Sequence, residues 1–248
     1  VGAAPRLENL TLTNNGGATI NFTGGLTAST GTNAAFAATG GGTVSVTGAT
    51  NTLATTTATA LNVANTTIGA GGLTFRSIAA NGATNGIVLN TTGAGGLTVT
   101  GTGAAGTGGT VQNSTATGIL LNSTGPVSLS SMVVSGSADD GINGASVNGL
   151  TLTGLSLVNN GNSTTDEGLE LTQLSGAASL TSNTFTGSAH NHVYLQNTST
   201  TVSSLAITNN TFNANIAATG NHALLIEGLT GAPTFTSINI ASNQFISA

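Results

Sequence analysis

The chain has 248 residues, of which only 4% are charged, and its formal net charge at pH 7 is −5. Its fixed cations are Arg6 and Arg76, so it has no basic stripe that could neutralise nucleic-acid phosphates or bind an anionic membrane. No apolar run approaches the roughly 18 residues of a membrane span. We therefore expect neither nucleic-acid binding nor membrane insertion.

The expected elements are short β-strands that recur along the chain. Residues 1–59 repeat less regularly, and from residue 60 onward a small residue or His is followed by alternating aliphatic residues. This first phrase begins at Ala60, Gly86, Gly118, Gly141, Gly168, His192 and His222. A second alternating phrase lies between successive copies of the first. It begins at Gly72, Gly96, Val127, Gly149, Ser179, Leu205 and Ile238. Alternation over four to six residues is the period of a half-buried strand.

The connections between these phrases vary in length. The interval from Gly86 to Gly118, for example, is clearly longer than the interval from Gly118 to Gly141. Unequal intervals around a constant strand phrase indicate a solenoid, in which strands stack while turns absorb insertions. No stretch has a sustained helical period. We therefore predict an all-β parallel β-helix of about nine to ten coils, with essentially no helix, forming a single domain over 1–248.

Three strand-turn phrases carry a family resemblance: LSLVNNGN (155–162), LTSNTFTG (180–187) and LAITNNTFNAN (205–215). They resemble the right-handed parallel β-helix of the pectate-lyase-like superfamily and of the passenger regions of bacterial autotransporters and haemagglutinin-like adhesins. The resemblance covers most of residues 60–248 and implies an Asn ladder at the turns. We expect this ladder at Asn159, Asn183, Asn209 and Asn243, and an aromatic stack at Phe185, Phe212 and Phe245.

Strand alternation predicts which side chains face outward. With the Gly or His of the first phrase as position zero, positions one and three should be buried, as at Ile119 and Leu121. Positions zero and two should then face solvent, which places His192, Tyr194 and His222 outside. In the last coil this numbering makes Ala223 and Leu225 the buried pair.

Acidic residues gather in the last coils. Two acidic pairs, Asp139-Asp140 and Asp166-Glu167, precede position zero in successive coils, so we expect them to lie in adjacent turns. On the same side we expect Glu170, His190, His192, Tyr194, His222 and Glu227. This is the one chemically rich face that the sequence predicts.

Three interpretations of this face stay open. All three concern the two acidic pairs, Asp139, Asp140, Asp166 and Glu167. They could bind Ca²⁺ through hard oxygen ligands, or they could supply the acid pair of a polygalacturonase-like glycoside hydrolase. They could also be solvated turns. The phrase ADDG at 138–141 resembles that enzyme family, but its Asn-Thr-Asp, Gly-His-Gly and Arg-x-Lys motifs are absent. The alternative for His192 and His222 is a surface ladder of stacked imidazoles. The remaining residues of the face are candidates for sugar binding: Glu170, His190, His192, Tyr194, His222 and Glu227.

Richness in Gly, Thr, Asn and Ser without Lys resembles large secreted or surface-displayed bacterial proteins. We therefore expect a secreted or cell-surface structural and adhesive segment, without catalysis or a required cofactor, from a longer repetitive protein. Its partner would be a surface glycan, a receptor on a host or neighbouring cell, or a second copy stacked along the axis into a fibre. The alternative function is polysaccharide binding or hydrolysis at the 139–227 face. Thr-x-Thr phrases such as 98–100 also suggest ice binding, but they recur without a strict period, so we do not expect a flat Thr array.

Overall fold

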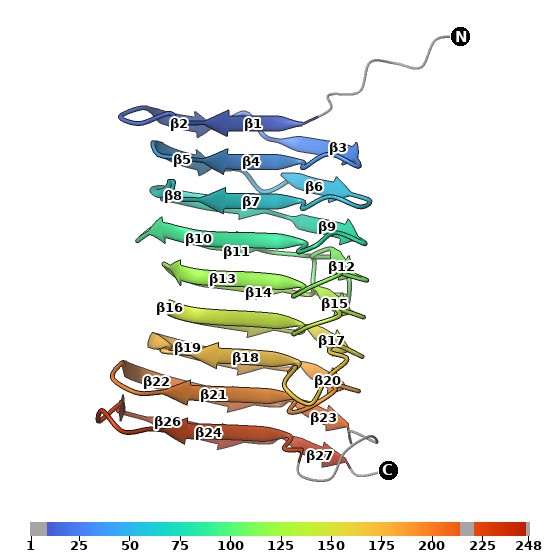
Figure 1. Cartoon of the computed structure of the whole chain (residues 1–248), viewed down its shortest axis with the longest axis vertical. Coiled ribbons are helices and arrows are strands. Elements are labelled where there is room, and N and C mark those ends of the chain that lie inside the picture. The colour runs from blue at the N-terminus through green and yellow to red at the C-terminus, as the bar shows by residue number, and fades with distance from the viewer. Residues whose placement is uncertain (1–8, 214–220, 247–248) are drawn as a thin grey trace.

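The computed structural model describes residues 9–213 and 221–246, and this part of the chain forms a parallel β-solenoid without helices (Figure 1). All of its strand pairs are parallel, and they line three faces. Nine strands stack on the third face, which corresponds to about eight full turns. In Figure 1 the strands in front run to the left and those behind run to the right as the chain descends, which is a right-handed path. The predicted fold class is confirmed.

The first face, here called face A, is in front in Figure 1. Its strands are β1 (Leu10–Thr13), β4 (Phe36–Thr39), β7 (Leu61–Ala64), β10 (Ile87–Gly93), β13 (Ile119–Thr124), the first half of β16 (Ile142–Thr153), β18 (Leu169–Thr172), β21 (Val193–Asn197) and β24 (Leu224–Gly228).

Face B lies behind face A. Its strands are β2 (Thr19–Phe22), β5 (Thr43–Val46), β8 (Thr67–Phe75), β11 (Leu97–Val99), β14 (Val127–Ser130), the second half of β16, β19 (Ser175–Thr181), β22 (Thr201–Thr208), β25 (Thr234–Phe235) and β26 (Ile238–Ala241).

Face C closes each coil. Its strands are β3 (Thr27–Gly31), β6 (Thr52–Thr55), β9 (Ser77–Asn81), β12 (Thr110–Gln112), β15 (Val133–Ser135), β17 (Ser156–Val158), β20 (Thr184–Thr186), β23 (Thr211–Asn213) and β27 (Gln244–Ile246). The weakly repetitive residues 9–59 form the first two coils of the same three faces. No helix in the described residues is long and apolar enough to cross a membrane.

Strand register is kept despite the unequal intervals. Ile87 pairs with Ile119, and Ile119 pairs with Ile142 after a shorter stretch of chain. All three side chains are fully buried. The variable residues lie in the turns, so the apolar positions one and three form a continuous core, as predicted for Leu121.

Position zero does not face solvent as expected. Gly141 and Gly168 are buried, and a Cβ atom on Gly168 would lie 2.6 Å from the hydroxyl oxygen of Ser188. The chain turns a corner between faces C and A at this point, so the alternation of a straight strand does not extend to it. Position two does face outward, as predicted, at Asn143, Glu170 and Tyr194, which are partly exposed and paired in register.

The expected register of the last coil is wrong by one residue. Val193 pairs with Leu224, not with Ala223, and Leu195 pairs with Ile226. Leu224 and Ile226 therefore pack against the core, while Leu225 lies beside the outward Tyr194. Position zero of this coil is Ala223 rather than His222, because it is Ala223 that aligns with His192.

Face C holds the predicted aromatic stack, with ring centroids 5.1 Å apart for Phe185 and Phe212 and 5.0 Å for Phe212 and Phe245. The Asn ladder differs from the prediction. Buried Asn210 accepts the N–H of Asn183, while Asn209 is exposed with a φ of 57°. Asn159 is likewise exposed and Asn160 is the buried neighbour, so two of the four predicted ladder residues are one position too early.

Candidate functional site

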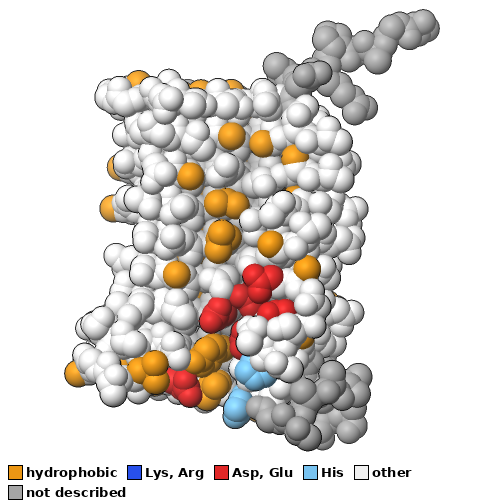
Figure 2. Space-filling model, in the orientation of Figure 1, with side chains coloured by type: hydrophobic (Ala, Val, Ile, Leu, Met, Phe, Trp, Pro, Cys, Tyr) orange, Lys and Arg blue, Asp and Glu red, His pale blue; other side chains and the backbone are white. Residues whose placement is uncertain are grey.

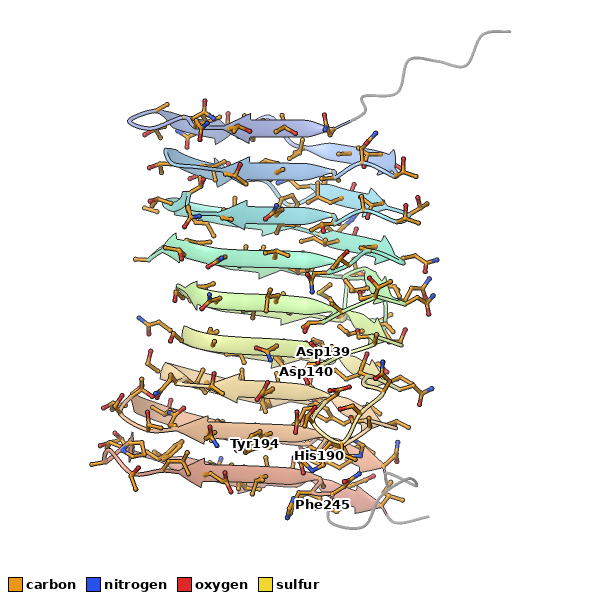
Figure 3. The ribbon with its side chains drawn as sticks, in the orientation of Figure 1. Asp139, Asp140, His190, Tyr194 and Phe245 are labelled. Carbon is orange, nitrogen blue, oxygen red and sulfur yellow. The ribbon has the colours of Figure 1, made fainter. Side chains whose placement is uncertain are left out.

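Three carboxylates meet at the corner where face C leads into face A. We call Asp140, Glu167 and Glu170 the acidic cluster, because one oxygen of each lies within 4.8 Å of the others. They come from the turn before β16, the turn before β18 and β18 itself. Figure 2 shows acidic side chains gathered on this part of the surface, and Figure 3 labels Asp140 there.

Hydrogen bonds within its own coil and to the next coil fix Asp140. Its Oδ1 accepts the main-chain N–H of Glu167 at 2.6 Å, and its Oδ2 accepts the side-chain amide of Asn143 at 2.7 Å. The same Asn143 amide donates to Glu170 at 2.5 Å. Asn143 therefore bridges two carboxylates of the acidic cluster.

Glu167 is held by the following coil. Its Oε1 lies 2.8 Å from Nδ1 of His190 and accepts the amide of Asn191 at 3.1 Å. Asn191 in turn accepts the main-chain N–H of His222 at 2.9 Å. A vertical ladder of polar side chains thus joins four coils at this corner.

Burial makes the acidic cluster hard to ionise. Desolvation raises the pKa of Asp140 to about 7, against hydrogen bonds from Asn143 and Glu167 that lower it. Desolvation also raises the pKa of Glu167 and of Glu170, and neighbouring carboxylates add to both shifts. Asp140 therefore keeps its proton to a higher pH than a free carboxyl does.

The other two predicted acids lie outside the acidic cluster. Asp139 accepts a hydrogen bond from the hydroxyl of Thr117 at 2.9 Å. Asp166 is buried and closes its own turn, because its Oδ2 accepts the main-chain N–H groups of Asn162 and Ser163, each at 2.9 Å. The structure thus replaces the expected four-acid group by Asp140, Glu167 and Glu170.

His192 lies inside the corner rather than on the outer face. It is 2% exposed, its Nδ1 is 2.9 Å from the Ser188 hydroxyl, and its Nε2 is bonded to the carbonyl oxygen of Asn213. Its ring packs beside Phe185 and Phe212. Burial lowers the pKa of His192, so it fills the corner as a neutral core residue.

His222 is exposed, as expected, but it does not stack on His192. Its Nδ1 is 3.0 Å from the side-chain oxygen of Asn191, because the register shift of the last coil aligns it with that residue. His190 is partly exposed and contacts Glu167. The three histidines therefore occupy three different environments.

A second group of polar side chains lies on the outer surface of face A. Tyr194 pairs beside Glu170, donates its hydroxyl to Glu227 at 2.9 Å, and accepts the amide of Gln196. Burial, together with the hydrogen bond to Glu227, raises the pKa of Tyr194 to about 12, so the phenol stays protonated. We call Asn143, Glu170, Tyr194, Gln196 and Glu227 the Tyr194 patch.

The donor set of the acidic cluster suits a hard cation. Ca²⁺ binds oxygens at about 2.3–2.6 Å, so one ion can reach three oxygens that lie within 4.8 Å of one another. It needs 6–8 oxygen ligands, and three carboxylates supply part of that set. Calcium binding stays a prediction, with Glu170 taking the place of Asp139 and Asp166.

Sequence reasoning missed Asn143, Asn191 and Gln196. All three stand at positions equivalent to predicted site residues: Asn143 aligns with Glu170, Asn191 with Glu167, and Gln196 with Glu227. Their uncharged side chains gave no signal in a chain rich in Asn.

The comparisons with known proteins found no matching family model, curated protein or solved structure. The parallel strand registers alone carry the fold assignment. The resemblance to pectate-lyase-like enzymes and adhesin passengers stays a prediction.

Proposed function

We propose that the chain is a structural and adhesive segment of a secreted or cell-surface protein, without catalysis of its own. The composition supports the location, since Lys is absent and Thr, Ser and Asn cover the surface. A solenoid with a continuous aliphatic core supports the structural role, because each coil is held by the coils on either side.

The observation that carries the adhesive role is the Tyr194 patch. Tyr194 and Glu170 are neighbours on adjacent strands, and the hydrogen bonds of Tyr194 to Glu227 and Gln196 orient its ring. All of these side chains stand on strands rather than on loops, so their arrangement is rigid.

A surface glycan is the partner that this chemistry suits. A Tyr ring provides an apolar face for a sugar ring, and carboxylates and amides bond to its hydroxyls. The acceptors are Glu170 and Glu227, and Gln196 provides an amide beside the ring.

A glycan array probed with the folded chain tests this proposal. Tyr194→Ala should lose binding, whereas Val88→Ala should bind like the parent, because Val88 has the same outward position in an earlier coil, away from the patch. Equal binding by the parent and Tyr194→Ala would remove the patch from the proposal. If the parent chain bound no glycan on the array, a surface glycan would be excluded as its partner.

Glycoside hydrolysis is the alternative function, and the acidic cluster is what favours it. A carboxyl with a pKa of about 7 can serve as a general acid, and Glu170 lies close to Asp140. Incubating each bound glycan with the chain and assaying new reducing ends separates the two functions. The adhesive function predicts no new reducing ends. Hydrolysis by the parent that disappears in Asp140→Asn would replace the adhesive function by the enzymatic one.

A further inference from the structure

Face B carries two columns of hydroxyl side chains that the sequence analysis did not expect. Thr98 pairs with Ser128, Ser128 with Thr151, and Thr151 with Ser179, and we call these four the groove column. Two residues further along the strands, Ser130 pairs with Thr153 and Thr153 with Thr181. The unequal insertions lie in turns and leave these positions in register. Both columns mix Ser with Thr, so neither is a flat Thr array.

Composition alone does not explain the columns. The equivalent outward column of face A is mixed and holds Val88, Leu120, Asn143, Glu170 and Tyr194. On face C, Val133 pairs with Ser156 and with Thr110. Face B keeps a hydroxyl at every coil from Thr98 to Ser179.

Most hydroxyls of the groove column are free to bind a ligand. In the described chain, Ser179 bonds with Thr181 at 3.0 Å, whereas the hydroxyls of Thr98, Ser128 and Thr151 bond to no other residue. Thr98 and Ser128 are partly exposed, and Thr151 is exposed. They therefore present donors and acceptors that only solvent or a ligand can satisfy.

A groove of about 430 Å³ runs beside the groove column, and Thr98, Ser128 and Thr151 line it. Its floor includes Gly96 and Gly149. The fold itself requires these glycines, because Gly149 has a φ of 92° and a Cβ on Gly96 would lie 2.5 Å from the Pro126 carbonyl oxygen. The free hydroxyls and the groove volume, which lies in the usual range for ligand sites, are the features that suit a ligand.

The lining defines the ligand chemistry. None of the described residues that line this groove is charged or aromatic, so it suits a neutral ligand held by hydrogen bonds rather than by ion pairing or ring stacking. The groove crosses successive coils, which repeat about every 4.8 Å. A polymer that offers hydroxyls at a similar spacing would meet an equivalent side chain at each coil, and an extended chain of neutral sugars has this form.

We propose that the face B groove binds a neutral linear polysaccharide lying along the solenoid axis, with Thr98, Ser128 and Thr151 hydrogen-bonded to successive sugars. This site is on a different face from the Tyr194 patch and shares no residue with it. Either site can therefore fail its test without affecting the other.

Native gels that contain soluble xylan, galactomannan or mixed-linkage β-glucan test the groove by retardation of the protein band. Polygalacturonate is the acidic comparison. The double substitution Thr98→Val with Thr151→Val removes two hydroxyls and keeps the β-branched shape. The matched control is Thr100→Val with Thr153→Val, in the same two coils but outside the groove lining. Circular dichroism melting verifies that both variants fold.

The expected result is retardation of the parent by a neutral polysaccharide. The affinity measured from this retardation should be at least tenfold weaker for the groove variant, because this variant loses two hydrogen bonds to the sugars. It should be unchanged for the control. No retardation by any of the neutral polymers, or equal loss in both variants, would overturn the proposal. Inhibition of ice recrystallisation by the parent, abolished in both variants without polysaccharide binding, would assign the hydroxyl columns to ice instead.

Discussion

One carboxylate oxygen of Asp140 accepts a hydrogen bond from the main chain of Glu167 in the next coil. The other accepts one from the side chain of Asn143 in its own coil. The first contact supports the fold in the way an Asn side chain would. The second places Asp140 beside Glu170. Burial raises the pKa of Asp140, and the nearby Glu170 carboxylate adds to the shift. Asp140 therefore both supports the fold and carries a carboxyl with a raised pKa.

This titration predicts a pH-dependent stability. Because the pKa of Asp140 rises from 3.8 to about 7 on folding, the folded chain holds a proton that the unfolded chain releases in this window. Stability should therefore fall as the pH rises from about 4 to about 7. Glu167 and Glu170 act in the same direction. His192 acts in the opposite one, because its lowered pKa costs stability as the pH falls below 6.5.

Asp140→Asn should remove the contribution of Asp140. The melting temperature of this variant, relative to the parent, should increase between pH 4 and about pH 7 and then level off. Val88→Ala, which removes no titratable group and lies outside the acidic cluster, should leave a constant difference. Parallel curves for Asp140→Asn and the parent would show that Asp140 is ionised at neutral pH.

At the scale of elements, the Asn ladder joins the turns after face B. Asn210 donates to the carbonyl oxygen of Leu180 at 2.8 Å and to Asn243 at 3.0 Å, and it accepts from Asn183. It is fully buried, so each bond satisfies a group that water cannot reach.

Asn210→Ala should lower the free energy of unfolding by roughly 2–4 kcal/mol, because the N–H of Asn183 and the carbonyl of Leu180 lose their partner. Asn209→Gly is the control: Asn209 is exposed with a φ of 57°, which Gly adopts freely, so a change within about 0.5 kcal/mol is expected. Urea unfolding measures both. Similar losses at the two positions would contradict the assignment of the buried ladder to Asn210.

The same elements show what the sequence can and cannot predict. Alternation identified the buried pair Ile119 and Leu121, because a straight strand has a fixed period of two. It failed for His192, which lies at a corner where the chain changes direction. In the pair Asn209-Asn210, composition cannot distinguish the residue with positive φ from the buried one. The acidic face was predicted as a region, but which acids converge depended on turns such as the one that Asp166 closes.

On the scale of the whole molecule, the two described ends of the solenoid differ in shape. The last coil exposes apolar side chains that elsewhere belong to the core, among them Ile238 at 46%, Ile240 at 48% and Phe245 at 57%. Figure 3 labels Phe245 on this coil. The first coil has a cavity of about 490 Å³, whose lining combines apolar residues, among them Phe22, Leu26 and Ala28, with polar ones such as Thr27.

We therefore expect axial self-association of the 248-residue chain, with the last coil of one copy on the first coil of another. Parallel strands would continue across such a junction, and apolar surface would leave water. Ile240→Lys with Phe245→Lys should shift sedimentation velocity profiles towards monomer over a wide range of concentrations. Leu120→Lys, on the side of the solenoid, should not. A parent chain that stays monomeric throughout would rule out the fibre subunit.

The one-dimensional order of the coils also has a mechanical consequence. Each described strand pairs only with strands of the coils on either side, so under a pull along the axis the coils can detach one after another. When a coil such as the one from Ile119 to Ile142 detaches, its span grows from about 4.8 Å to about 80 Å of extended chain. A tether of this kind yields in steps and absorbs work at each step, so under flow or shear it would protect a bound contact by lengthening before the contact breaks.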